Sequence, residues 1–295
     1  MKTMYFGMSV DDVALKGWCK LDNLRSLIDF FTKEEIPATF FTVPIDEESD
    51  KPFYTLDSGY VPVIREAVLS GFDFEQHGLR HNRFELGVPP QMVLDLPHET
   101  ENKRYAMENR EFLEKDHCTA NCRARLRQGR VILEDALETA VTGFRSPALQ
   151  ESSGMFAALK EEGYLFDGSA ALQETGWDYI LGNTDVPRRE ITPERYADCR
   201  KKSHGLTLPL TTDYTWYLTK EKYACTMELA KQDFRQCMTN DIPFITVAHV
   251  DPVHDGEGLR FLHEFYAFAR EEAERSGVKL EFANLKQIAE KINHE

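Results

Sequence analysis

The stretch Met4-Tyr5-Phe6-Gly7-Met8-Ser9-Val10 is a mainly apolar run that ends in two adjacent carboxylates, Asp11 and Asp12. An amphipathic segment follows at residues 21–33, with its leucines, isoleucine and phenylalanine on one helical face. The same unit recurs along the chain: a short β-branched or aromatic run, a turn with Gly, Pro or Asp, and an amphipathic stretch. This alternation predicts an α/β fold in which helical crossovers join parallel strands.

Seven runs have the composition of buried strands. They lie at residues 4–10, 38–43, 72–76, 141–144, 164–166, 206–210 and 244–249. Apolar stripes at helical spacing predict helices at residues 21–33, 60–70, 131–140, 154–162 and 221–238. Seven strands of this kind suit either a barrel or an open doubly wound sheet.

The composition is that of a globular protein. Of the 295 residues, 42% are hydrophobic and 29% are charged, and a chain of this length can bury a large core. The 35 Lys and Arg against 50 Asp and Glu leave a formal net charge of −15 without a dense basic run, so we expect neither nucleic acid nor an anionic membrane as a partner. The N-terminal residues lack the apolar core and cleavage site of a secretory signal, which predicts a cytoplasmic protein.

Residues 97–130 interrupt the alternation of strands and helices. Residues 99–115 and 122–128 are strongly charged and contain few apolar positions. We therefore predict an exposed helical insertion that serves as a lid or as an oligomer contact. Because no internal repeat, low-complexity tract or flexible linker divides the chain, we predict a single domain over residues 1–295.

Six cysteines are too few in a chain of this length to form a disulfide framework. One spacing, His117-Cys118 followed by Cys122, has the form of half a metal site, but no second pair follows at zinc-ribbon spacing. Free thiols on a helix are the simpler interpretation.

Polar side chains with catalytic potential follow five of the predicted strands. Parallel strands bring their carboxyl ends to one rim, so these side chains are expected to converge. The first strand ends in Asp11 and Asp12, whose mutual repulsion calls for a cation or an arginine nearby. The third is followed by His77 and His81, which can face the same way on a turn of helix and offer two nitrogen ligands to one metal.

Three further strand ends supply an arginine, a carboxylate and a histidine. Arg145 can hold a carboxylate bidentately, and Pro147 fixes the turn that follows it. Asp167 ends the fifth strand. His249 ends the last strand and His254 follows it, and the position on the strand favours His249. The sequence thus predicts one active site drawn from both halves of the chain.

These motifs, in this order, resemble those of the polysaccharide deacetylase superfamily, the NodB-homology or carbohydrate esterase family 4 group, over roughly residues 4–290. The matching residues are Asp11-Asp12, His77 and His81, Arg145 and Pro147, Asp167, and Val247-Ala248-His249. The resemblance implies an irregular (β/α)7 barrel, which agrees with the seven predicted strands.

The resemblance also implies a divalent metal, with Zn²⁺ as the best match, held by Asp12, His77 and His81. Asp11 would then be the general base that activates the attacking water. Arg145 would orient Asp11 and keep it ionised.

Further roles are implied for the later motifs. His249 would protonate the leaving amine, and Asp167 would hold His249 in its protonated form. Pro147 would contact the substrate, and the backbone N–H that follows it would stabilise the oxyanion. Trp216, in an aromatic cluster after the run at residues 206–210, either lines the substrate pocket or packs in the core.

The sequence departs from the family pattern beside these motifs. Val13 stands where the first motif usually ends in glycine, and Gly78 stands where Ser or Thr usually follows the first histidine. Ala148 and Leu149 replace an aromatic residue and a glycine, and Ala170 stands near Asp167 where a tryptophan is usual. The residues that carry the chemistry are retained, whereas those that line a sugar groove are not.

Three functions follow from these observations. The first is metal-dependent hydrolysis of a C–N amide bond, as in an N-deacetylase of a sugar or sugar-like small molecule or of an oligosaccharide. The second is ring opening of a cyclic imide or ureide, and the third is ligand binding without catalysis. The presence of both Asp11 and His249 favours an enzyme, because a binding module needs neither a base nor an acid.

Overall fold

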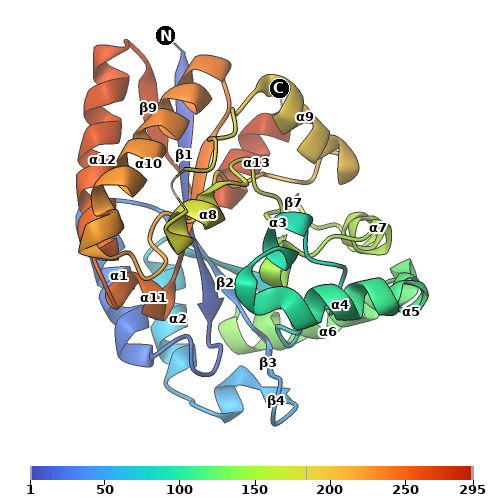
Figure 1. Ribbon diagram of the computed structural model, residues 1–295. Helices are drawn as coiled ribbons and strands as arrows, with labels where there is room; N and C mark the ends of the chain where they lie inside the picture. Colours follow the sequence, from blue (N-terminus) through green and yellow to red (C-terminus); the bar gives the residue numbers. More distant parts are fainter. Residues whose placement is uncertain (1, 184, 294–295) are drawn as a thin grey trace.

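The computed structural model describes residues 2–183 and 185–293 and has a parallel sheet at its centre (Figure 1). The strands run in the order β7-β6-β5-β2-β1-β8, and β9 also pairs with β1. Their bounds are β1 Thr3–Val13, β2 Ala38–Thr42, β5 Asp73–His77, β6 Gly143–Arg145, β7 Phe166–Asp167, β8 Phe244–His249 and β9 Lys279–Phe282. Every pair in this sheet is parallel, which confirms the predicted α/β class.

The predicted strand at residues 206–210 is not a regular strand. The segment at residues 207–213 lies between β7 and β8 and forms isolated bridges only, from Thr207 to Asp167, from Leu210 to Ala171 and from Asp213 to Val247. Pro209 explains the interruption, because proline has no N–H to donate to a ladder. These bridges continue the curled sheet from β7 to β8 and make the barrel irregular.

Strand β9 was not predicted. Its four residues carry two charges, and the strand is only partly buried, since it pairs with just the first half of β1. A short strand at the edge of a sheet has no continuous apolar run for a sequence pattern to reveal.

The predicted helices are present around the sheet. They are α1 Leu21–Glu34, α2 Tyr60–Leu69, α6 Thr119–Leu137, α7 Ser153–Glu161 and α10 Lys220–Asn240, and α12 Gly258–Arg275 lies beside α10 (Figure 1). In α1 the residues Leu24, Leu27 and Phe31 are buried, as the apolar stripe predicts. No helix in the described part of the chain is long and apolar enough to cross a membrane.

Helix α13, Leu285–Asn293, closes the amino-terminal end of the barrel. Leu285 and Ile288 pack so closely on Gly7 of β1 that a Cβ there would lie 2.8 and 2.9 Å from their side chains. The N–H of Leu285 also donates to Thr39 Oγ1 of β2, at 2.8 Å.

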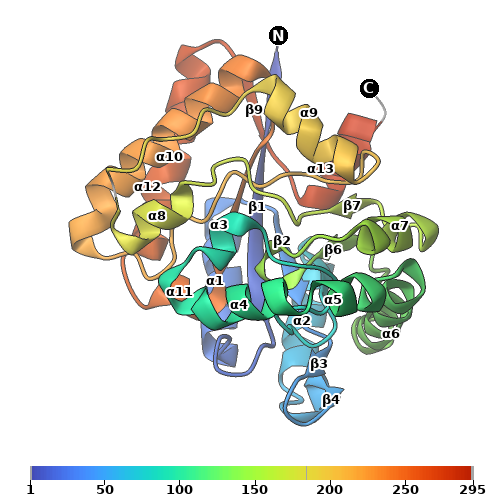
Figure 2. The same ribbon diagram turned by 45° about the vertical axis from the view of Figure 1, so that its right-hand side comes forward.

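The charged segment at residues 97–130 is helical, but only part of it is exposed. It contains α4 Thr100–Glu108, α5 Arg110–Asp116 and the start of α6, and Figure 2 shows α4 and α5 away from α10 and α12. The exposed insertion predicted for residues 122–128 is wrong there, because Cys122 and Leu126 are buried where α6 packs on α7. Their four-residue spacing forms an apolar stripe that the surrounding arginines conceal in the sequence.

The half metal site considered at His117, Cys118 and Cys122 does not form. His117 Nε2 lies 2.8 Å from the carbonyl oxygen of Phe84, Cys118 is exposed and Cys122 is buried. The cysteines are free thiols, which was the simpler interpretation.

Candidate active site

The two carboxylates at the end of β1 line the same cavity, of about 480 Å³. Adjacent side chains on a regular strand point to opposite faces. Here the register between β1 and β2 shifts between Val10 and Val13, and Asp12 has a φ of 64°, in the left-handed region. This irregularity allows both Asp11 and Asp12 to reach one cavity.

Asp12 meets the two predicted histidines. His77, the last residue of β5, has its Nε2 3.3 Å from Asp12 Oδ1, and His81 has its Nε2 3.0 Å from the same oxygen. The predicted turn of helix between the histidines is wrong: the chain forms a loop, in which Gly78 and His81 have φ values of 60° and 66°. The three ligand atoms nevertheless lie within 4.8 Å of one another.

These three residues fit a divalent metal ion. Asp12 Oδ1 is buried and makes no hydrogen bond of regular geometry among the described residues; the Nε2 atoms of His77 and His81 face it instead, and a cation bound between the three atoms would satisfy all of them. His77 Nδ1 lies 3.0 Å from the carbonyl oxygen of Arg145, so a proton on Nδ1 leaves Nε2 free as a ligand. Two imidazole nitrogens and one carboxylate are a ligand set found in catalytic zinc sites.

The pKa of Asp12 is consistent with a charged ligand. Burial acts to raise this pKa, but the interactions with His81, His77 and His249 together outweigh burial. The pKa of Asp12 is therefore held well below its ordinary value, and the carboxylate is ionised at neutral pH.

Arg145 lies directly against Asp11. Its Nη1 donates to Asp11 Oδ1 at 2.7 Å and to Ser9 Oγ at 2.9 Å, and its Nε donates to the carbonyl oxygen of Gly168 at 2.9 Å. The guanidinium is fully buried and lies 4.3 Å from the centre of the Phe41 ring. An arginine held on so many sides gives Asp11 a fixed orientation and a compensating charge.

His249 also lines the cavity, and it is paired with a different carboxylate from the one predicted. His249 is in register with Asp11 across β1 and β8, and its Nδ1 donates to Asp213 Oδ2 at 2.9 Å. Burial acts to lower the pKa of His249, but the bond to Asp213 and the charges of Asp12 and Asp11 outweigh it and raise the pKa to about 9. His249 is thus cationic at neutral pH.

The prediction that Asp167 holds His249 is wrong. Asp167 Oδ1 accepts from Ser169, and Asp167 Oδ2 accepts from Thr207 Oγ1 at 2.9 Å. The sequence did not predict a role for Asp213, although this residue directly precedes the aromatic cluster around Trp216.

The other candidate for the general acid, His254, has its Nδ1 2.8 Å from the carbonyl oxygen of Val250 and does not line the cavity.

All three tryptophans of the chain line one side of the cavity. The Trp216 ring is perpendicular to the imidazole of His249, with centroids 4.5 Å apart. Trp18 and Trp177 contact Trp216, at centroid distances of 5.4 and 6.2 Å. Trp18 and Trp177 stand far apart in the sequence without a motif, so only the folded chain identifies them as pocket residues.

Other sides of the cavity come from two further segments. Residues 93–99 contribute Leu96 and Glu99, and Glu99 forms an ion pair of 2.6 Å with Arg83, which also lines the cavity. Ala148 and Leu149 line it as well, both with φ in the left-handed region. Pro147, predicted as a substrate contact, does not line the cavity.

A model of the polysaccharide deacetylase family matches residues 5–166, more than half of the chain. The chain belongs to the polysaccharide deacetylase family. The family is one of hydrolases that act on carbon–nitrogen bonds other than peptide bonds, and it also has pseudoenzyme members. No curated protein sequence matches the chain significantly.

Solved structures are similar to this polysaccharide deacetylase family member at low sequence identity, and the first of those below shares its fold. A Mycobacterium smegmatis protein assigned to the polysaccharide deacetylases is 15% identical, with 99% of this chain and 91% of that chain covered and a TM-score of 0.57. A polysaccharide deacetylase from Bacillus cereus is 13% identical, with 96% and 92% covered and a TM-score of 0.45. A CE4-family pseudoenzyme from Bacillus anthracis is 11% identical, with 98% and 66% covered and a TM-score of 0.46.

One departure of this family member from the usual pattern has a steric reason. A Cβ at Gly78 would lie 2.4 Å from Glu85 Oε2 and 2.7 Å from the ring of Pro147. The Ser or Thr usual at this position therefore has no room here. Pro147 thus shapes the loop between the two histidines.

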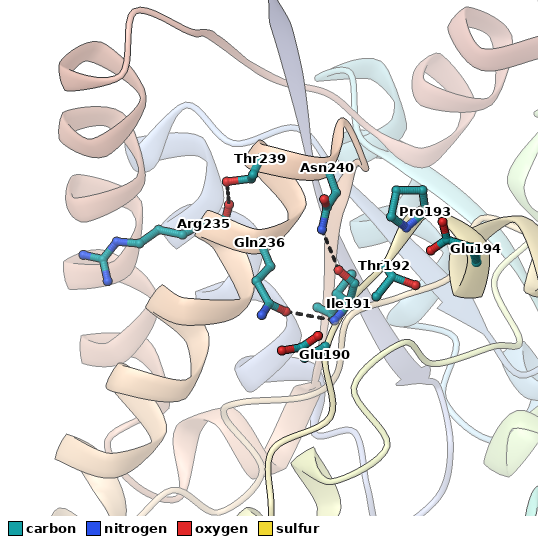
Figure 3. Close-up of a pocket in the computed structure, with 9 residues that line it drawn as sticks. All are labelled: Glu190, Ile191, Thr192, Pro193, Glu194, Arg235, Gln236, Thr239 and Asn240. Atoms are coloured by element: carbon teal, nitrogen blue, oxygen red, sulfur yellow. Dashed lines mark hydrogen bonds between the residues drawn. The ribbon is translucent and has the colours of Figure 1, made fainter.

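A second hollow, of about 460 Å³, lies between α10 and the start of α9 Pro193–Lys202 (Figure 3). Gln236 Oε1 accepts a hydrogen bond from the N–H of Ile191 at 2.8 Å, and Asn240 Nδ2 donates one to the carbonyl oxygen of Ile191 at 2.7 Å (dashed lines in Figure 3). No histidine or cysteine of the described chain lines this hollow. Its polar groups hold the loop before α9 through the backbone of Ile191.

Proposed function

We propose that this polysaccharide deacetylase family member is a metal-dependent hydrolase that removes an N-acetyl group from a sugar or sugar-like small molecule. The observation that carries the proposal is the convergence of one set of three residues and two pairs on one cavity. They are the ligand set of Asp12 with His77 and His81, the pair Asp11–Arg145, and the pair His249–Asp213.

A divalent ion, for which Zn²⁺ suits the ligand set, supplies Lewis acidity and lowers the pKa of a water molecule when bound at Asp12, His77 and His81. Asp11 takes the proton from the attacking water, and Arg145 keeps the Asp11 carboxylate ionised and aimed into the cavity. We assign the stabilisation of the oxyanion to the backbone N–H of Ala148.

His249 donates a proton to the amine nitrogen as it leaves. A raised pKa of about 9 keeps this imidazole protonated at neutral pH, and Asp213 fixes the ring through Nδ1 so that Nε2 is the nitrogen left to donate. An amine expelled without this proton would be a very poor leaving group. Base and acid are therefore separate residues, Asp11 and His249, on the adjacent strands β1 and β8.

The size and walls of the cavity favour a small substrate. Its volume of about 480 Å³ is in the range of pockets for single small molecules. The indoles of Trp18, Trp177 and Trp216 offer flat apolar surfaces, which suit the apolar face of a sugar ring.

The test is turnover by the purified protein, first stripped of metal by a chelator and then supplied with Zn²⁺ or Co²⁺. Release of acetate from N-acetylated amino sugars, only with metal present, supports the proposal. The variant Asp11→Asn should bind Zn²⁺ as the wild type does but lose hydrolysis, and unchanged hydrolysis would refute the assignment of the base. Turnover of cyclic imides alone would instead assign a ring-opening amidohydrolase, and metal binding without any turnover would indicate a binding protein.

A further inference from the structure

Glu85 contacts the loop between the two proposed histidine ligands. Its Oε2 accepts a hydrogen bond from the N–H of Leu79 at 2.7 Å, and its Oε1 accepts one from the N–H of Arg80 at 2.6 Å. The residue is 6% exposed. Residues 78–82 form neither helix nor strand, so no regular hydrogen-bond pattern holds this loop. Other groups bind Gly78 and the carbonyl oxygen of Leu79, and the Glu85 carboxylate binds the N–H groups of Leu79 and Arg80.

Gly78, the loop residue next to His77, has no side chain with which to hold the loop. The first loop residue is Gly78, and its missing side chain leaves the space that Glu85 Oε2 and Pro147 fill. With a φ of 60°, Gly78 also has a backbone conformation that most residues avoid. The carboxylate therefore supports the loop from outside.

Glu85 is itself held by the segment that was predicted as a lid or an oligomer contact. Arg125 of α6 donates from Nη1 to the carbonyl oxygen of Glu85 at 2.6 Å, and its Nη2 binds both carboxylate oxygens of Asp116 at 2.8 Å. The neighbouring residue Phe84 is held by His117, through the contact of 2.8 Å already described.

A second set of contacts holds Glu85 from the loop after β6. The N–H of Leu86 donates to Gln150 Oε1 at 3.0 Å, and Gln150 Nε2 donates to the carbonyl oxygen of Asn82 at 2.6 Å. The residues on both sides of Glu85 are thus fixed by side chains from elsewhere in the fold. A carboxylate on a fixed backbone can hold a loop in one conformation.

We propose that Glu85 is a positioning residue that sets the loop so that His77 and His81 meet Asp12 before a metal ion arrives, and that α5 and α6 serve to hold Glu85. This inference rests on the metal site of the proposed function. Presetting the ligands removes the entropic cost of ordering the loop during binding. Loss of an outer contact of this kind usually weakens metal binding about 10- to 100-fold.

The experiment measures Zn²⁺ affinity by competition with a chromophoric chelator. In Glu85→Gln, an amide NH₂ replaces one carboxylate oxygen and faces a backbone N–H, so we expect the dissociation constant for Zn²⁺ to rise about 10- to 100-fold. The matched control is Glu75→Gln on β5. Glu75 is also buried and accepts from two backbone N–H groups, those of Thr142 and Gly143, but it makes no hydrogen bond to residues 78–81.

A second measurement uses the wild type alone and therefore does not require any variant to fold. In the metal-free wild type, the amides of Leu79 and Arg80 should exchange with solvent much more slowly than unbonded loop amides. Rapid exchange at both amides would overturn the inference, as would equal Zn²⁺ affinity in Glu85→Gln and wild type, or equal weakening in Glu75→Gln. A wild type that binds no Zn²⁺ would refute the proposed function itself, whereas the amide exchange still reports on the Glu85 contact.

Discussion

Asp167 and Asp213 are two buried carboxylates with the same local pattern. Each is followed two residues later by a hydroxyl side chain, Ser169 or Thr215, which closes a tight turn. Asp167 Oδ1 accepts from the N–H of Ser169 at 3.2 Å, and Asp213 Oδ1 accepts from the N–H of Thr215 at 2.6 Å. In each case the hydroxyl donates to the same carboxylate oxygen.

The second oxygen separates the two residues. Asp167 Oδ2 accepts from Thr207, whereas Asp213 Oδ2 accepts from His249. The difference follows from the neighbouring strand: Asp167 is bridged to Thr207, and Asp213 is bridged to Val247, two residues before His249. A local turn therefore presents a carboxylate, and the strand beside it decides whether that carboxylate serves the active site.

The largest expected effect is that of Asp213→Asn on catalysis. Without the carboxylate, His249 loses its fixed orientation and its stabilised charge, and kcat/KM at neutral pH should fall by about 10²- to 10⁴-fold, the usual contribution of a general acid. Steady-state kinetics with an N-acetylated amino sugar that the wild type hydrolyses measures this effect. The paired variant, Asp167→Asn, should lose less than about tenfold; a reversed order would show that the comparison assigns the wrong carboxylate.

The next effect concerns folding stability and belongs to Asp167. Burial raises its pKa to about 6, against the hydrogen bonds from Ser169 and Thr207. A carboxyl group whose pKa is raised by folding contributes stability below its unfolded pKa, near 4, and that contribution is lost as the pH rises through about 6. The free energy of unfolding of the wild type, relative to Asp167→Asn, should therefore fall by about 3 kcal/mol over this window. Urea titrations at several pH values test this, and parallel pH curves for the two proteins would contradict it.

A third prediction concerns the pH profile of activity. His249 acts in its protonated form, and its pKa is raised by the bond to Asp213 and by the charges of Asp12 and Asp11, of which Asp12 is a proposed metal ligand. Activity should therefore persist above neutral pH and decline on the alkaline side. In Asp213→Asn this alkaline limb should move down by more than about one pH unit, toward the ordinary histidine value. Profiles of kcat/KM against pH measure the shift. Asp167→Asn should leave the limb in place, and an unmoved limb in Asp213→Asn would mean that another group donates the proton.

The smallest effect compares two threonine hydroxyls. Thr215 Oγ1 donates to Asp213 at 2.8 Å, and Thr207 Oγ1 donates to Asp167 at 2.9 Å. In Thr215→Val, Asp213 should be held less firmly, and kcat/KM should fall about fivefold, equivalent to about 1 kcal/mol for one hydrogen bond. Thr207→Val removes the same kind of bond and should change only the thermal midpoint of unfolding. Equal loss of activity in both variants would remove the distinction between the two carboxylates.

Local sequence predicted much of the molecule. The alternation of apolar runs and amphipathic stretches was sufficient for the parallel α/β sheet, and the residues at strand ends were sufficient to single out Asp11, Asp12, His77, His81 and Arg145. Both kinds of signal are short-range, because periodicity and turn chemistry act over a few residues.

The remaining features depend on which segments become neighbours. Three features join residues without a shared motif: the bulge that lets Asp11 and Asp12 reach one cavity, the hydrogen bonds from the histidine loop to the Glu85 carboxylate, and the cluster of tryptophans. The pairing of His249 with Asp213, where the sequence predicted Asp167, is the clearest case. Both aspartates form the same turn, and they are bridged to different segments. Residue types and spacing determined which groups are available for chemistry; strand order and register, which are set by long-range packing, decided which of them meet.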